Sequence, residues 1–437
     1  MDFELGLALV GLLVALVIAG FPIGLGLMLL AVLGVWLLRG DLAVAVRLIG
    51  SSVLTSTSEY VFSAIPLFVL MGALVSASGV GRDTFAVAQW MLRGLRGGLG
   101  VATVVANALF AAVTGVSVAS ASVFTQVAVP PMLQHGYHPR FAVGVVAGSS
   151  ILGMLIPPSI LMIVFGVLAE VSIGRLFLAG ILPGLLMAAA FAAKILILAR
   201  IRPGYVFEAG AKLEASADGL DTRAALGKLV PIVLLAGLVL GGIYGGVFTP
   251  TEAGAAGAAG ALAVALLRRS LDRQSFWAVL IKTGQVAVGI LFLLMAASVY
   301  SRMLTMAGIP AALAGWMQEL GAGTYGFLAG HIAVMIALGM ILDSVSILLI
   351  VVPIAVPIAK SLGIDLVHFG IVTIVAVEIG LLTPPFGLSV FAVRNALIGE
   401  RIRLETVFAG ALPFAAVMLA VLVLVVYFPG LSTWLAY

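Results

Sequence analysis

The sequence predicts an all-α polytopic membrane protein, arranged as an inverted repeat with two re-entrant hairpins and two proline-broken helices. Of its 437 residues, 63% are hydrophobic and 9% are charged, which is typical of chains that bury most of their surface in a bilayer. A glycine also stands four residues before a proline pair twice, at Gly153 before 157–158 and at Gly380 before 384–385. Proline removes a backbone donor and clashes with the preceding turn, so each apolar segment is expected to break inside the membrane.

The broken segments indicate where a functional site is located. Irregular backbone at membrane depth is tolerated only where it is buried in protein or lines a cavity. Matched broken helices in two halves of one chain are typical of a solute-binding site near the midplane of the bilayer.

The composition excludes several functional classes. There is no cysteine, which excludes disulfides, thiolate metal sites and cysteine nucleophiles. No phosphate-binding P-loop is present, so the chain cannot itself use ATP. The stretch at 115–117 could be mistaken for a serine-hydrolase turn, but no histidine base can be placed beside it, and an enzyme is not expected.

The remaining polar residues do not indicate nucleic-acid or metal binding. The net charge of +4 comes with basic residues concentrated in short loops, where they set orientation in the membrane. The four histidines are too scattered for a metal or haem site: His135, His138, His331 and His368.

The first half begins with apolar and interfacial segments. Residues 5–38 are apolar with an interruption at 20–22, and form either one long tilted span or two short ones. Residues 39–59 are more polar and are expected to lie along the membrane interface. A span is predicted at 60–78 and a basic loop at 79–98.

A re-entrant hairpin is predicted at 99–134. Its two apolar arms of about 16 residues are short for a span of about 20, and they flank a polar stretch at 114–122. A broken helix at 141–170 and a span at 175–200 complete the first half.

The second half repeats this order. Leu-Phe-Val-Leu-Met at 67–71 is echoed by Leu-Phe-Leu-Leu-Met at 291–295, and Ala-Gly-Ile-Leu-Pro at 179–183 by Ala-Gly-Ala-Leu-Pro at 409–413. The predicted elements are a polar loop at 201–228, spans at 229–247 and 252–268, a basic segment at 269–282, a span at 283–305, a hairpin at 325–360, the second broken helix at 368–398 and a span at 407–428.

The charges of the loops predict that the two halves are inverted. If the basic loops at 79–98, 200–228 and 268–282 are all cytoplasmic, the first hairpin must enter and leave on the cytoplasmic side. Five crossings separate it from the second hairpin, which therefore opens on the opposite face. The C-terminus then falls outside.

The hairpin tips and the neighbouring breaks supply hydroxyl and freed carbonyl oxygens. Neutral oxygens suit a hard monovalent cation such as Na⁺, and half-helix N-termini facing the same cavity favour an anionic substrate. Alternatively, small residues there only let membrane helices pack closely. The predicted ion-binding and substrate-binding residues are Thr114, Gly115, Ser117, Ser149, Ser150, Gly153 and Pro157 in the first half, and Asp343, Ser344, Ser346, Glu378, Gly380, Thr383 and Pro384 in the second.

Two carboxylates in this set are unusual for a membrane interior. A charge at the bilayer centre costs about 3 kcal/mol or more, so its presence suggests a function. Asp343 at the second tip is predicted to be either a cation ligand or a helix cap. Glu378 is predicted to support the second break, or to reach a polar neighbour in a structural pair.

Several of these motifs together resemble the large membrane subunit of tripartite ATP-independent periplasmic (TRAP) transporters, of which the C4-dicarboxylate type is the best-known branch. The resemblance covers essentially the whole chain. It is carried by Thr114-Gly115-Val116-Ser117, Ile156-Pro157-Pro158-Ser159, the Val-Pro-Ile-Ala-Val-Pro stretch at 352–357, Gly363-Ile364-Asp365, Val367-His368-Phe369-Gly370 and the Gly-Leu-Leu-Thr-Pro-Pro-Phe-Gly-Leu stretch at 380–388.

The resemblance implies Na⁺-coupled import of an organic acid anion across the bacterial inner membrane by an elevator mechanism of the ion transporter superfamily. A transport domain (99–200 and 325–437) would slide against scaffold helices (1–98 and 201–324). A periplasmic receptor would deliver the substrate, and a small four-helix membrane subunit, here expected as a separate chain, would complete the complex. Na⁺ would be the coupling ion, at the two regions of tip and break, with no other cofactor.

The alternative within the same superfamily is a stand-alone Na⁺-coupled anion transporter or a Na⁺/H⁺ antiporter. A requirement for the receptor discriminates between the two. Nothing in the sequence separates dicarboxylates from sialic acid or other organic acids as the substrate.

Overall fold

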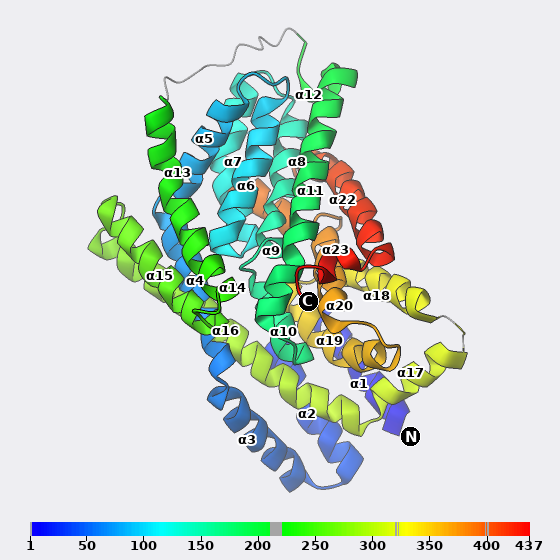
Figure 1. The fold of residues 1–437 in the computed structure, drawn as a ribbon. Coiled ribbons are helices and arrows are strands. Elements are labelled where there is room, and N and C mark those ends of the chain that lie inside the picture. Colours follow the sequence, from blue (N-terminus) through cyan, green and yellow to red (C-terminus); the bar gives the residue numbers. More distant parts are fainter. Residues whose placement is uncertain (1, 210–220, 320, 322, 398, 400–401) are drawn as a thin grey trace.

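The computed structural model describes residues 2–209, 221–319, 321, 323–397, 399 and 402–437. All regular elements in these residues are helices (Figure 1). Seven helices are long and apolar enough to cross a membrane, or eight if the bent pair Pro139–Leu155 and Ile160–Ala169 counts as one span. The predicted all-α polytopic class is confirmed. Residues 210–220 of the polar loop predicted at 201–228 lie outside the described residues. The end of that loop is wrong as predicted, because a helix begins at Thr222.

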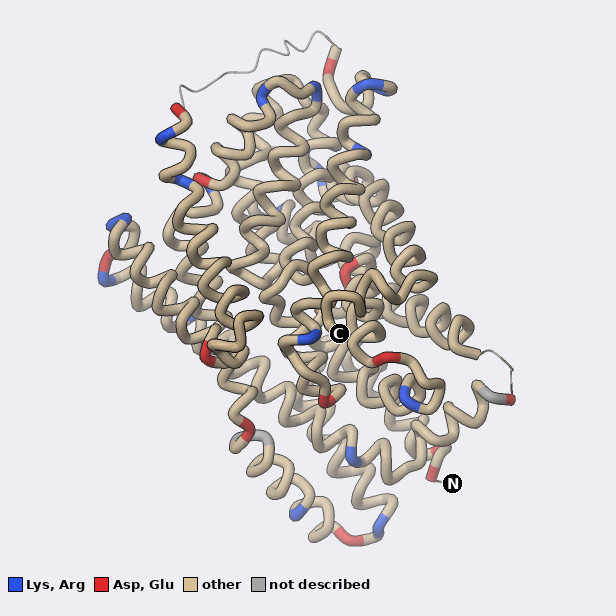
Figure 2. The backbone as a smooth tube through the Cα atoms, viewed as in Figure 1, with Lys and Arg blue, Asp and Glu red and all other residues tan. Residues whose placement is uncertain are grey.

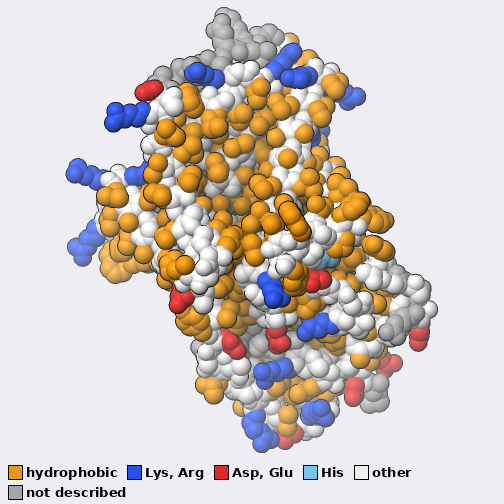
Figure 3. All heavy atoms as spheres, in the orientation of Figure 1, with side chains coloured by type: hydrophobic (Ala, Val, Ile, Leu, Met, Phe, Trp, Pro, Cys, Tyr) orange, Lys and Arg blue, Asp and Glu red, His pale blue; other side chains and the backbone are white. Residues whose placement is uncertain are grey.

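Charged residues lie mostly toward the ends of the molecule. In Figure 2 charges lie at the top of the view, at helix ends on the left and scattered through the lower part, and a middle region of the tube between the top and the centre carries few. The face shown in Figure 3 is covered by hydrophobic side chains across the same middle region. This distribution is what a bilayer requires, because apolar side chains face lipid and charges stay near water.

The N-terminal apolar region is two helices and not one long span. Helix α1 (Asp2–Ile18) and helix α2 (Ile23–Arg39) pack side by side, with Leu9 against Gly34 and Leu13 against Gly26, so they run antiparallel. Helix α3 (Leu42–Ser58) covers the predicted interfacial segment. It begins at Asp41, whose carboxylate accepts a hydrogen bond from the backbone of Ala43 at 2.7 Å.

Helix α4 (Ala64–Ala77) and three further spans form a group, which we call the α4 group. Helices α15 (Pro250–Leu267) and α16 (Arg273–Met306) both pack on α4, and α2 packs on α16. Glycines of α15 allow the close approach, because Gly257 leaves room for the side chain of Met71. A fourth span runs from Thr222 to Tyr244 as α13 (Thr222–Ala236), the π-helical turn Gly237–Gly241 and α14 (Gly242–Tyr244). The spans predicted at 60–78, 229–247, 252–268 and 283–305 are confirmed.

The prediction of a basic loop at 79–98 is wrong for most of that range. Residues Val80–Leu92 form helix α5, which packs against the first hairpin. The side chains of Thr84, Phe85 and Ala88 are buried on one face, while the arginines lie elsewhere on the helix and in the turn that follows. The apolar spacing is helical, and in this segment it outweighs the basic residues that suggested a loop.

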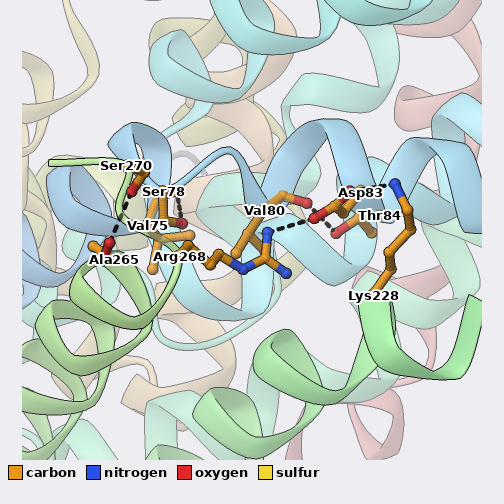
Figure 4. A network of polar contacts seen from close by, with 9 residues as sticks. All are labelled: Val75, Ser78, Val80, Asp83, Thr84, Lys228, Ala265, Arg268 and Ser270. Atoms are coloured by element: carbon orange, nitrogen blue, oxygen red, sulfur yellow. Dashed lines mark hydrogen bonds and ion pairs between the residues drawn. The ribbon is translucent and has the colours of Figure 1, made fainter. Parts of the chain in front are cut away.

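An ion triad ties α5 to the α4 group (Figure 4). The carboxylate of Asp83 accepts a hydrogen bond from Lys228 of α13 at 2.7 Å, and its other oxygen accepts one from Arg268 at the end of α15. The side chain of Asp83 is 18% exposed, so solvent screens this network only partly.

Replacing Asp83 by asparagine should therefore lower the stability of the protein. Lys228 and Arg268 would keep their charges in a partly desolvated place with no carboxylate to pair with. The expected loss is about 1 to 2 kcal/mol, between the values for exposed and buried ion pairs. The thermal unfolding midpoint of the purified protein in detergent measures it. The matched control is Arg47→Gln, since Arg47 and Asp41 are 4.0 Å apart with side chains 76% and 53% exposed. Equal effects of the two substitutions would contradict a structural role for the triad.

Both predicted hairpins are present. The first consists of α6 (Gly98–Thr114) and α7 (Ser117–Gln134), which are joined by only two residues. The second consists of α18 (Gly323–Gly339) and α19 (Ser344–Ser361), joined by residues 340–343. In the chain, α5 precedes the first hairpin and α17 (Ile309–Glu319) precedes the second, as a repeat requires.

Both broken helices end their first part before the proline pair, as predicted. The first consists of α8 (Pro139–Ser150), α9 (Leu152–Leu155) and α10 (Ile160–Ala169), with a bend of 43°. The second consists of α20 (Leu366–Gly380) and α21 (Leu388–Ala396). The spans predicted next are α11 (Ile173–Ile201), followed by the short α12 (Pro203–Val206), and α22 (Leu404–Tyr427), followed by the short α23 (Gly430–Thr433).

The two halves exchange packing partners. The first arm of each hairpin packs on the broken helix of its own half, α6 on α8 and α18 on α20. The parts beyond the breaks pack on the other half, α10 on α19 and α21 on α7. The open end of the first hairpin lies at the top of Figure 1 and that of the second lies lower in the view. We call α6–α11 and α18–α22 the hairpin core, and its inverted halves enclose the candidate site.

Candidate functional site

The tip of the first hairpin is docked on the first break. The carbonyl oxygen of Gly115 accepts a hydrogen bond from the backbone of Ile160 at 3.3 Å. Gly115 has φ +64°, and a Cβ there would lie 2.5 Å from the carbonyl oxygen of Pro158. Only glycine satisfies both conditions. Gly153 faces the tip from the other side of the break, with the backbone of Val116 against it.

The second tip meets the second break in the same manner. The carbonyl oxygen of Met340 accepts a hydrogen bond from the backbone of Phe386 at 3.1 Å. At the base of this tip α18 crosses α20 so closely that a Cβ on Gly380 would lie 2.5 Å from the Cα of Gly339. The pairing of each tip with the break of its own half, which the sequence suggested, is therefore present in both repeats.

Most predicted hydroxyl groups are engaged locally. Thr114 donates to Phe110 O, Ser149 to Val145 O, Ser150 to Ala147 O and Thr383 to Gly380 O, all between 2.7 and 2.9 Å. Such bonds to the preceding turn are ordinary for hydroxyls in membrane helices. They leave the oxygen lone pairs able to accept a hydrogen bond or ligate a cation. Pro157 and Pro384 lie in the two breaks and contribute no backbone donor.

Asp343 caps helix α19. Its carboxylate accepts a hydrogen bond from the backbone of Ser346 at 3.1 Å and another from the Ser346 hydroxyl. Of the two roles predicted for Asp343, the capping role is the one that these contacts supply.

Glu378 is the point at which the two hairpins meet. It lies on α20, three residues before the break, and its side chain is fully buried. The Ser344 hydroxyl of the second tip donates to Glu378 Oε1 at 3.1 Å. The Ser117 hydroxyl of the first tip lies beside the same carboxylate. Neither Ser117 Oγ nor Glu378 Oε2 makes a hydrogen bond of normal geometry, so both are buried polar atoms without a partner.

The sequence reasoning missed Asn107. Its side-chain amide on α6 donates to Ser149 Oγ at 2.7 Å, and its carbonyl accepts from the Ser120 hydroxyl of α7 at 2.6 Å. All three residues are completely buried. Asn107 thus joins both arms of the first hairpin to the first broken helix. The available signal was a lone amide within an apolar run, which in a membrane protein usually marks a contact between helices.

A comparable link occurs in the second half. His331 Nε2 of α18 lies 2.9 Å from the hydroxyl of Thr373 on α20. In both halves a buried polar bond connects the first arm of the hairpin to its broken helix, 42 residues further along the chain. Each half therefore holds its hairpin and broken helix together by polar contacts as well as by packing.

A cavity of about 750 Å³ lies between the hairpin core and the α4 group. On one side it is lined by the end of α10, including Glu170, and on the other by Glu59, Thr251 and Arg302. Packing across this boundary is therefore incomplete at that point, whereas the residues around Glu378 are buried.

Comparison with known proteins assigns the chain to a family. The family described as "Tripartite ATP-independent periplasmic transporter, DctM component" matches residues 10–431. The chain belongs to this family. It is 36% identical over 392 residues to the C4-dicarboxylate TRAP transporter large permease protein DctM of Pseudomonas aeruginosa, with 89% of each chain covered. It is 33% identical to the protein of the same name from Vibrio cholerae, covering 97% of this chain and 96% of that one.

The fold of this DctM-family protein also resembles a solved transporter structure. The YdaH transporter of Alcanivorax borkumensis matches with a TM-score of 0.65 at 17% identity, over 89% of each chain. The relatives are named transport permeases, so the prediction that this chain is a transport protein and not an enzyme is confirmed. Other family relatives are named for different solutes, a sialic acid permease of Vibrio cholerae (31% identical) and an isethionate permease of Oleidesulfovibrio alaskensis (31% identical).

Proposed function

We propose that the chain is the large permease of a Na⁺-coupled importer, which takes an organic acid anion from a periplasmic receptor and moves it across the inner membrane. The observation that carries this proposal is the convergence of the two docked hairpin tips on Glu378, at the centre of an inverted repeat. Two broken helices there supply freed carbonyls for a cation and half-helix N-termini for an anion. A core that only packs helices together needs neither a cation site nor an anion site.

The hairpin core is the proposed moving unit, and the α4 group with α1–α3 is the proposed scaffold. The exchange of packing partners makes the two hairpins and two broken helices one interlocked body. The cavity beside Glu170 and Arg302 supports a sliding boundary, because a permanently joined interface would be filled to the density of a protein interior.

The proposed coupling ion is Na⁺, held at each tip and its break. The oxygens around the first tip belong to Thr114, Ser117, Ser149 and Ser150, and those around the second to Ser344, Ser346 and Thr383. Hydroxyl and carbonyl oxygens are ligands that hard cations prefer. No other cofactor is proposed.

The proposed partners are a periplasmic receptor and a small four-helix membrane subunit. One relative, the isethionate permease DctMQ, is longer, and this chain corresponds to 64% of its length. The remaining part of that protein is where a fused small subunit would lie.

A C4-dicarboxylate or similar carboxylate is the proposed substrate. The relatives with 36% and 33% identity are named for C4-dicarboxylates, and those at 31% for sialic acid and isethionate. All of these solutes are organic anions, which is the class that half-helix N-termini favour.

Uptake into proteoliposomes tests the proposal. The vesicles would hold this chain with its small subunit, and radiolabelled organic acids would be offered with and without an inward Na⁺ gradient and with and without the receptor. We expect accumulation only when both the gradient and the receptor are present. Uptake that needs Na⁺ but no receptor would replace the proposal by the stand-alone transporter. Uptake driven without a Na⁺ gradient would contradict Na⁺ coupling.

A further inference from the structure

The carboxylate of Glu378 is buried without a counter-charge. Its side chain has no solvent exposure, and its one hydrogen bond of normal geometry comes from the neutral Ser344 hydroxyl. An isolated carboxylate in such a place is very costly unless its charge is neutralised. Whatever neutralises it must therefore come from a protein cation or from a bound ion.

No protein cation among the described residues neutralises the Glu378 carboxylate. The helices packed against α20 are α9, α10, α11, α18, α19, α22 and α23. None of their titratable groups forms an ion pair or hydrogen bond with Glu378 in the described part of the chain. Besides Glu378, the groups on these helices and at their ends, and on α20 itself, are Glu170, Arg175, Lys194, Arg200, Arg202, Tyr325, His331, Asp343, Lys360, Asp365, His368, Arg403, Glu405, Tyr427 and Tyr437.

The group that neighbours Ser344 in the chain is acidic and supplies no positive charge. Asp343 precedes Ser344, the residue that contacts Glu378, and it is also acidic. Its carboxylate is turned to the start of α19, where it binds the backbone and hydroxyl of Ser346. Lys194 is occupied elsewhere, with its ammonium 3.6 Å from the centre of the Phe414 ring.

The oxygens around Glu378 form a ligand set that draws on both halves. Glu378 Oε2 and Ser117 Oγ are both buried without a partner, and the Ser117 side chain lies beside the Glu378 carboxylate. Together with Ser344 Oγ they bring one carboxylate and two hydroxyls to one place. One negative charge with neutral oxygens suits a monovalent cation.

We infer that Glu378 is the charge-carrying ligand of a monovalent cation site shared by the two hairpin tips, with Ser117 and Ser344 as its hydroxyl partners. The occupant is a Na⁺ or a proton, since either neutralises the carboxylate and satisfies the two unpartnered oxygens. This inference rests on the proposed function and adds to it a site that belongs to neither repeat alone. A cation there holds both tips on α20. Its loss leaves the Glu378 carboxylate charged and unpaired, so water must enter to solvate it and the two tips must move apart.

Cation binding by the purified full-length protein tests the inference without any transport assay. Equilibrium binding of ²²Na⁺ gives the number of ions per chain, and the thermal unfolding midpoint without Na⁺ is recorded across a pH series. The variants are Glu378→Gln, Ser117→Ala and Ser344→Ala. The matched controls are Glu405→Gln, an exposed glutamate at the start of α22, and Ser122→Ala, a half-buried serine of α7 whose hydroxyl donates to Val118 of its own helix.

The two occupants give different results. For Na⁺, Glu378→Gln should bind one ion fewer per chain than the wild type and the controls. For a proton, the ion count stays equal, the wild-type midpoint falls as the pH rises, and Glu378→Gln removes that fall. In either case Ser117→Ala and Ser344→Ala should weaken the same binding, which keeps the test valid if Glu378→Gln does not fold.

The inference is overturned if Glu378→Gln and the two serine variants equal the wild type both in ion count and in pH dependence. Such a result would leave receptor-dependent and Na⁺-dependent uptake untouched. Conversely, failure of uptake with intact cation binding at Glu378 would contradict the proposed function and not the shared site.

Discussion

Substituting Gly410 by alanine is expected to remove most of the folded protein from the membrane. Helix α22 crosses α8 at Gly410 and Gly144, where the two backbones touch. A Cβ on Gly410 would overlap the carbonyl oxygen of Arg140, which is backbone and cannot rotate away. The helices would have to separate, at a cost of at least about 3 kcal/mol. The yield of monodisperse protein in detergent, followed by size-exclusion chromatography, measures this loss.

A glycine elsewhere in a long helix provides the control. Gly289 lies in α16, and a Cβ there meets nothing within 4 Å. Gly289→Ala should keep a normal yield, and it should gain slightly in helix propensity. If Gly410→Ala also kept a normal yield, the contact between α8 and α22 would not be essential to the hairpin core.

Replacing Asn107 by alanine is expected to destabilise the protein by about 2 to 4 kcal/mol. The change removes two buried hydrogen bonds, leaves the hydroxyl of Ser120 without its acceptor and opens a small void. Because Asn107 also supports Ser149 beside the first break, the apparent affinity for the coupling ion should fall as well. Thermal unfolding and the Na⁺ dependence of uptake measure the two effects.

Asn395→Ala is the matched control for this prediction. Asn395 is exposed near the end of α21, so its removal should change the unfolding free energy by less than about 0.5 kcal/mol. A loss of stability without any change in Na⁺ dependence would assign Asn107 to packing alone.

The sequence predicted the features that depend on local chemistry. Proline pairs must interrupt a helix wherever they occur, so both breaks were placed correctly beside Gly153 and Gly380. The order of hairpins and spans followed from apolar length and from short repeated matches. Helix α5 was missed because it has only 13 residues and its arginines resemble those of a loop.

Contacts between distant segments could not be predicted in this way. Ser117 and Glu378 lie in different halves, and no spacing in the sequence indicates that they meet. The partners of Asn107 likewise depend on how α6, α7 and α8 pack. Asp343 shows the opposite case, because an aspartate immediately before a helix is a local capping signal, and that role is present.

The exchange of packing partners between the halves affects how the chain is made. Helix α7 ends at Gln134, but its partner α21 begins at Leu388. A ribosome that adds 5 to 20 residues per second needs roughly ten seconds to a minute to synthesise the intervening chain. During that time the newly inserted first hairpin has one face without its native neighbour. The membrane insertion machinery or lipid must cover that face until synthesis is almost complete. In a chain truncated before α21, the face of α7 that packs against α21 stays without its native neighbour.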